Sequence, residues 1–164
     1  MAGLAAVLRT TVLVIGVVID ASGQLRPEEK PEIHEGVSEA ADRLQRPECA
    51  SLLGPNAREV LLSARYVVIS FGKPKLNSTG GFNVLTASVD RARNLIIINS
   101  EGPFMEPTLK VHGVRFNLGL SDRQLRGLLL LHEVGHLTGK FQHDGSDPEL
   151  SRSYSTRVME ACFR

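Results

Sequence analysis

The fold is organised around one stretch of sequence, Ser121-Asp-Arg-Gln-Leu-Arg-Gly-Leu-Leu-Leu-Leu-His-Glu-Val-Gly-His-Leu-Thr-Gly139. Ser121 and Gln124 have the spacing of a capping box, in which each side chain bonds the other residue's backbone N–H at the start of a helix. The leucines that follow recur at helical spacing and give the helix a strongly apolar surface. Gly139 suits the left-handed turn with which many helices end. The stretch therefore predicts a buried helix from Ser121 to about Thr138.

Late in this helix the chain reads His132-Glu-Val-Gly-His136. Residues four apart lie on one helix face, so the two imidazoles can bind one metal ion from the same side. Glu133 is placed to reach a water molecule on that metal. A catalytic zinc ion takes three protein ligands and keeps one position open. We therefore expect His132 and His136 to be metal ligands and Glu133 to be the catalytic residue.

The run His132-Glu-Val-Gly-His-Leu-Thr-Gly139 resembles the zincin metallopeptidases, and in particular the first part of the metzincin signature H-E-x-x-H-x-x-G-x-x-H/D. The resemblance implies a zincin-like domain, Zn²⁺ as cofactor, a peptide or protein substrate, and Glu133 as general base. The signature then breaks, because Gln142 stands where the family has its third ligand. A turn longer by one residue would supply His143 and a turn longer by two would supply Asp144, with Asp147 as a further alternative.

Three further features follow from the resemblance. Zincins bind an extended substrate along an edge strand, for which 82–89 and 95–99 are the candidates here. An oxyanion donor is expected, and Tyr154 and His112 are candidates by residue type. Metzincins also place a methionine in a turn beneath the metal. The only methionine after the motif, Met159, lies in an expected helix and is interpreted as a core residue.

Outward from the helix, the pattern predicts both helices and strands. We expect a strand at Tyr66–Phe71 and a hairpin of strands 82–89 and 94–99 joined by residues 90–93. Helices are expected at Val37–Leu44, from an Asn56 N-cap to Ala64, and from Ser153 or Ser155 to Cys162. The fold class is therefore α+β, a single domain in which a small twisted sheet packs on the active-site helix and on backing helices.

The N-terminal residues differ from the rest of the chain. A positive charge at Arg9, an apolar run at 11–19 and small residues before Gln24 have the layout of a signal peptide over residues 1–23. The apolar run is about half the ~20 residues that a spanning helix needs, which argues against a permanent membrane anchor. Once the signal peptide is removed, we expect no stable membrane insertion. Residues 24–36, rich in Pro and Glu, are expected to form an extended lead-in to a domain at 37–164.

The expected secretion bears on whether the two cysteines form a disulfide. An even number of cysteines in an oxidising compartment favours pairing, so we expect a disulfide between Cys49 and Cys162. Two buried free thiols are the alternative.

Composition limits the remaining function classes. The 164 residues carry a formal net charge of +1, which argues against a protein that binds nucleic acid by neutralising phosphates. The sequence thus favours a secreted or periplasmic zinc metalloprotease. The alternatives are a zinc-binding but non-catalytic secreted domain on the same fold, such as an adhesion module, and a structural domain in which the His-Glu-x-x-His pattern is accidental.

Overall fold

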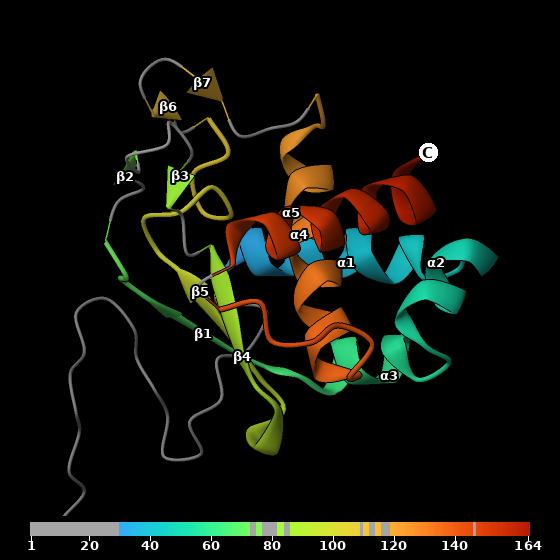
Figure 1. Ribbon diagram of the computed structural model, residues 1–164. Helices are drawn as coiled ribbons and strands as arrows, with labels where there is room; N and C mark the ends of the chain where they lie inside the picture. The colour runs from blue at the N-terminus through green and yellow to red at the C-terminus, as the bar shows by residue number, and fades with distance from the viewer. Residues whose placement is uncertain are drawn as a thin grey trace, which may run out of the picture.

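Figure 1 shows the computed structural model of the protein. The structure describes residues 30–72, 75–76, 82–83, 86–108, 110–111, 114–115, 119–145 and 147–164. The expected signal peptide at 1–23 and the oxyanion candidate His112 lie outside the described residues. None of the helices that the structure describes is long and apolar enough to cross a membrane.

The domain is α+β, as predicted, with the described helices gathered on one side of a small mixed sheet (Figure 1). The helices are α1 (Pro31–Arg43), α2 (Pro47–Leu53), α3 (Ala57–Ser63), α4 (Asp122–Leu137) and α5 (Pro148–Val158), the last followed by a π-helical turn η3 (Met159–Phe163). The sheet contains β1 (Arg65–Ile69), β4 (Ala87–Asp90) and β5 (Leu95–Asn99). Two further pairs are β2 (Lys75–Leu76) with β3 (Phe82–Asn83), and β6 (Lys110–Val111) with β7 (Val114–Arg115).

The sheet has the order β1-β5-β4, so β5 is central and β4 lies at an edge of the described sheet. β1 pairs with β5 in parallel, and β4 pairs with β5 in the antiparallel direction. The predicted hairpin is confirmed: β4 and β5 are joined by the 3₁₀ turn η2 (Arg91–Arg93) and by Asn94, whose φ is 47°. Its first strand is shorter than expected, because Phe82–Asn83 pairs with β2 instead.

The α4 helix begins as the sequence predicts. The Ser121 hydroxyl accepts a hydrogen bond from the Gln124 backbone N–H, and the Gln124 side chain accepts one from the Ser121 N–H. The helix ends at Leu137, and Gly139 adopts a φ of +77°, which glycine reaches without strain. Leu125, Leu128, Leu130 and Leu131 are buried, so α4 runs through the hydrophobic core.

Part of the expected lead-in is helical, which corrects the sequence interpretation. Residues 31–36 belong to α1, which begins at Pro31 rather than at Val37. Proline is well suited to the first turn of a helix, where its missing N–H would have no partner. Ile33, Gly36 and Ala40 are buried at helical spacing on the face of α1 that packs against the core. Pro31 and Glu32 therefore form the first turn of α1 and not an extended segment.

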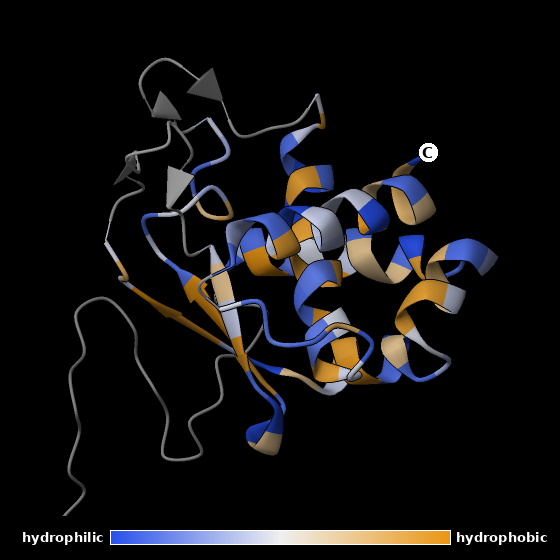
Figure 2. Ribbon diagram, viewed as in Figure 1, coloured by the Kyte–Doolittle hydropathy of each residue, from blue (hydrophilic) through white to orange (hydrophobic). Residues whose placement is uncertain are grey.

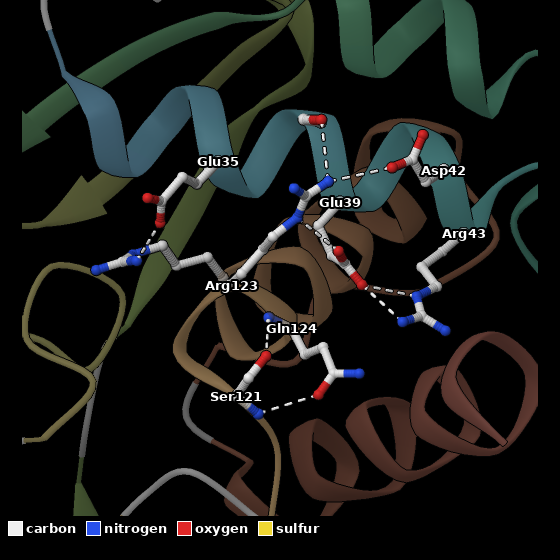
Figure 3. A network of polar contacts seen from close by, with 9 residues as sticks. Glu35, Glu39, Asp42, Arg43, Ser121, Arg123 and Gln124 are labelled. Carbon is white, nitrogen blue, oxygen red and sulfur yellow. Dashed lines mark hydrogen bonds and ion pairs between the residues drawn. The ribbon is translucent and has the colours of Figure 1, made fainter.

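Close packing of α1 on α4 depends on two glycines. A Cβ at Gly127 would lie 2.6 Å from Glu39 Cγ, and one at Gly36 would lie 3.1 Å from Arg126 Cβ. Figure 3 shows the polar contacts along this junction, where the Glu39 carboxylate accepts bonds from Arg123 Nε of α4 and from Arg43 of α1, both at 2.8 Å. The lack of a side chain at these two positions thus lets the helices approach closely, and the Arg123–Glu39 ion pair joins them.

The C-terminal helix also starts earlier than expected. Asp147 caps α5, its carboxylate accepting bonds from the backbone N–H groups of Glu149 and Leu150, and Pro148 occupies the first turn. Neither Ser153 nor Ser155 is the cap, because both lie inside the helix. The sequence indicates Asp147 as a candidate metal ligand, but Asp followed by Pro is also a strong start signal for a helix, and the structure uses it as one.

The predicted disulfide is confirmed. Cys49 of α2 and Cys162 of η3 are joined, and both side chains are fully buried. Arg46 donates a hydrogen bond to the Cys162 carbonyl at 3.1 Å, and the Arg43 guanidinium lies 4.7 Å from the centre of the Phe163 ring. The end of the chain is therefore fastened to the first two helices. Figure 2 shows the apolar residues that fill the interior, which run along β1 and recur on the helices.

Candidate metal centre

Two histidines of α4 form the base of the site. His132 and His136 lie one helical turn apart, are 6% and 5% exposed, and direct their Nε2 atoms to within 3.0 Å of each other. The helix can hold them there because its capped first turns and its buried leucines fix its position in the core. The sequence expectation that both imidazoles face one point is confirmed.

The turn after α4 brings a carboxylate to the same point. Beyond Gly139 the chain folds back, and the Phe141 N–H donates to the Gly135 carbonyl at 2.9 Å. The Phe141 ring lies directly on Gly135, where a Cβ would be 2.2 Å from the ring. Asp144 follows, with Oδ2 3.1 Å from His132 Nε2 and Oδ1 3.4 Å from His136 Nε2.

His132, His136 and Asp144 therefore form a group that could hold a metal ion, with all three ligand atoms within 4.8 Å of one another. The two other candidates for the third position are placed elsewhere. His143 belongs to the same turn but is exposed and outside this group, and Asp147 caps α5. Of the three alternatives that the sequence left open, the fold brings Asp144 to the histidines.

Electrostatics favour the ionised form of Asp144 and the neutral form of His136. Burial alone would raise the pKa of the Asp144 carboxyl, but hydrogen bonds with His132 and Ser151 and the fields of both histidines hold that pKa well below its usual range. Burial, followed by repulsion from His132, lowers the pKa of His136 against the opposing effect of Asp144. A carboxylate next to neutral histidines is the protonation state in which such side chains bind metals.

Glu133 lies next to this group in a different environment. The residue is 7% exposed, and burial raises the pKa of its carboxyl from 4.5 to about 7, with the negative charge of Asp144 adding to the rise and His132 opposing it. A carboxyl whose pKa lies near neutrality can both accept and release a proton at that pH. The side chain thus has the property that a general acid–base residue needs.

Two residues of α5 support the histidines. Ser155 Oγ lies 3.0 Å from His132 Nδ1, on the side of the ring away from Nε2. Tyr154 stacks on Phe141 with ring centres 4.4 Å apart, and the edges of both aromatic rings contact the two imidazoles. The Tyr154 hydroxyl accepts a hydrogen bond from the Gln142 N–H at 3.3 Å. Tyr154, named from sequence only as an oxyanion candidate, therefore lies in the wall of the site.

Ser155 was missed as a site residue because no local pattern relates it to a histidine 23 positions earlier. The sequence indicates Ser155 only as a possible helix cap. Its contact with His132 depends on how α5 packs against α4. Met159 is partly buried against the hydrophobic core, which agrees with its interpretation as a core residue.

The edge strand β4 completes the surroundings of the site. It packs against α4, and the η2 turn that follows it contacts the C-terminal end of that helix. Of the two strands proposed for substrate binding, β5 is central in the sheet and β4 is at the edge. Of these two candidates, β4 is therefore the one with an unpaired side in the described sheet, in which β1 forms the opposite edge.

Comparisons with known proteins do not assign this site to a family. The chain matches no protein-family model, and neither a curated protein nor a solved structure is detectably similar to it. The function must therefore be argued from the side chains themselves.

Proposed function

We propose that this protein is a secreted zinc-dependent metallopeptidase of zincin type, which hydrolyses peptide bonds. The observation that carries the proposal is the convergence of two buried imidazoles and one carboxylate, next to a buried glutamate that interacts electrostatically with His132 and Asp144. Each of these side chains has the residue type that the chemistry requires, and both histidines and Glu133 are buried.

The spacing of the three ligand atoms fits a tetrahedral ion. Zinc binds nitrogen and oxygen ligands at about 2.0–2.2 Å, so a tetrahedral site separates its ligand atoms by about 3.3 Å. The two Nε2 atoms are 3.0 Å apart, and Asp144 places Oδ2 3.1 Å from His132 Nε2 and Oδ1 3.4 Å from His136 Nε2, so each imidazole lies near a different oxygen of the carboxylate. Two imidazoles with one carboxylate are also a ligand set that leaves a fourth position open, as catalytic zinc sites do.

The choice of zinc follows from the ligand types. Imidazole suits zinc and several other transition metals, whereas calcium and magnesium take oxygen ligands almost exclusively. Ser155 supports the assignment, because a histidine that ligates through Nε2 carries its proton on Nδ1 and donates it to a neighbouring acceptor. The Ser155 hydroxyl is that acceptor.

In this proposal Glu133 does the proton transfer. A bound zinc ion would supply Lewis acidity, polarising the scissile carbonyl and lowering the pKa of a water molecule. The Glu133 carboxylate accepts a proton from the attacking water and delivers it to the nitrogen of the leaving amine. Its burial makes it a stronger base than an exposed glutamate, as the raised pKa reflects.

The remaining residues bind and orient. An extended peptide can pair with the open side of β4, which would carry its scissile bond along α4. The buried disulfide, together with the signal-like N-terminal sequence, supports an oxidising secreted or periplasmic location. N-terminal sequencing of the exported protein tests that location: a mature chain beginning at Gln24 is expected, and a retained Met1 contradicts it.

The test of function combines metal analysis with a peptide-substrate screen. The purified, oxidised protein should bind about one zinc per chain, and Asp144→Ala should lose it while the neighbouring control His143→Ala keeps it. Glu133→Gln should keep the metal and abolish hydrolysis. Wild-type protein that binds no zinc refutes the proposal. Zinc binding without hydrolysis of any peptide would instead favour the non-catalytic zinc-binding domain.

A further inference from the structure

One arginine outside the motif joins two parts of the candidate metal centre. Arg91 is the first residue of η2, directly after the edge strand β4. Its Nε donates to the carbonyl of His136, and its terminal NH2 group donates to the carbonyl of Phe141 at 2.9 Å. In Figure 1 the β4–β5 turn and the C-terminal end of α4 both lie toward the lower end of the view.

The two carbonyls belong to different segments of the site. The first is on a residue of α4 whose side chain faces the metal position, and the second is in the turn that carries Asp144 three residues later. The last carbonyls of a helix have no partner within it, and a cation close to them is favourable. Arginine is suited to this position because its planar guanidinium holds two acceptors at a fixed separation.

We propose that Arg91 is a positioning residue, which sets the distance between His136 and Asp144 and thereby the geometry at the metal. This inference rests on the proposed function, because it concerns the same site. No hydrogen bond other than that of the Phe141 N–H to Gly135 ties the backbone of residues 140–143 to α4 among the contacts described. The Arg91 guanidinium adds a second connection between α4 and residues 140–143, the segment that precedes Asp144.

The geometry also connects the edge strand to the metal. Because Arg91 follows Asp90, the last residue of β4, its side chain links the end of that strand to the end of α4, in addition to the packing of β4 on the helix. A substrate that pairs with β4 would therefore be held at a defined distance from the two segments that supply the ligands.

Arg93 provides a matched control. It lies on the same turn, carries the same charge, and forms an ion pair with Asp90 at 3.2 Å with a side chain that is 72% exposed. Removing Arg93 changes the net charge of the turn by the same amount as removing Arg91. Any difference between the two variants therefore reports the contacts to the α4 end.

The experiment measures zinc affinity and the visible absorption spectrum of the Co²⁺-substituted protein for wild type, Arg91→Ala, Arg91→Lys and Arg93→Ala. We expect Arg91→Ala to weaken zinc binding by on the order of ten- to a hundredfold, as losses of supporting contacts around metal ligands do. Its Co²⁺ spectrum should change in shape, since that spectrum reports ligand geometry. Arg93→Ala should match wild type, and Arg91→Lys should recover part of the affinity.

The outcomes separate the two proposals. If wild type binds Zn²⁺ and Co²⁺ but Arg91→Ala and Arg93→Ala have the same affinity and spectrum as wild type, the positioning role is wrong while the metal site stands. If wild type binds neither ion, the proposed function itself fails. Should Arg91→Ala not fold, Arg91→Lys decides: a spectrum and affinity identical to wild type would overturn the inference, because lysine cannot hold both carbonyls in the same fork.

Discussion

The buried Glu133 should make the metal-free protein less stable as the pH rises, and replacing it by glutamine should remove that dependence. In the unfolded chain this carboxyl titrates near 4.5, whereas burial raises its pKa in the folded protein to about 7. Between these pH values the folded state keeps a proton that the unfolded state has lost. Stability therefore falls as the pH increases through this window, and the fall is complete about one pH unit above the upper value.

The size of the effect follows from the two pKa values. Each tenfold difference in acidity between the folded and unfolded states corresponds to about 1.4 kcal/mol, so this carboxyl costs about 3 kcal/mol of unfolding free energy above neutral pH. The side chain is almost completely buried, so screening by solvent does not reduce this figure greatly. Glu133→Gln has no charge to bury and should be more stable than wild type by that amount at pH 8.

The assay is equilibrium urea unfolding in the presence of a chelator, followed by circular dichroism, at intervals from pH 5 to pH 8. The free energy of unfolding of wild type should fall relative to Glu133→Gln across this range. Glu149→Gln, an exposed glutamate in the first turn of α5, controls for the loss of one negative charge. A constant difference between wild type and Glu133→Gln at every pH would refute the reasoning, because it would show that Glu133 titrates alike in both states.

Three other changes test the supporting structure. Replacing both cysteines by alanine opens a loop of 113 residues, so the free energy of unfolding measured by urea titration should fall by about 5 kcal/mol. A loss below about 2 kcal/mol would contradict the chain-entropy explanation. Gly135→Ala should displace the Phe141 ring, which should lower the free energy of unfolding by about 1–3 kcal/mol in thermal unfolding and weaken zinc binding. An unchanged zinc affinity would show that the turn adjusts without moving the Asp144 carboxylate. Ser155→Ala should weaken zinc binding by on the order of ten- to a hundredfold in competition titrations, and equal affinities for it and for the exposed control Ser153→Ala would rule out its support of the histidine.

Much of the core of this molecule could be predicted from local patterns. The capping box of α4, the shared face of His132 and His136, the β4–β5 hairpin and the disulfide all follow from spacing or composition. Each depends on residues that are neighbours in sequence or, for the cysteines, on there being only one possible pair. Local rules decide such features because no distant contact competes with them.

The third member of the metal group could not be predicted, because a tertiary contact selects it. The turn after Gly139 could supply His143, Asp144 or Asp147 to the histidines, depending on its length. The packing of the Phe141 ring on Gly135 selects the conformation in which Asp144 reaches them. The positions of Ser155 and Arg91 depend in the same way on how α5 and the hairpin pack against α4. No spacing along the chain encodes these contacts.

Two helix starts were misjudged for a related reason. The sequence pattern places Pro31 in an extended segment and indicates Asp147 as a metal candidate, although Pro31 begins α1 and Asp147 caps α5. Proline and aspartate occur both in loops and in the first turn of helices, so their residue type does not distinguish the two. Burial of Ile33 on one side of α1 is what makes the helical alternative more favourable.

The disulfide has a consequence for how damage to this protein would be detected. It closes residues 49–162 into a covalent ring, which contains both the histidine motif and most of the described domain. A single peptide-bond cut anywhere inside that ring leaves two fragments joined through sulfur. A nicked molecule would keep the mass of an intact chain, apart from one added water, and would separate on an electrophoresis gel only after reduction. If the proposed peptidase activity extends to this chain itself, self-cleavage would be detected only by analysing the sample with and without a thiol reagent.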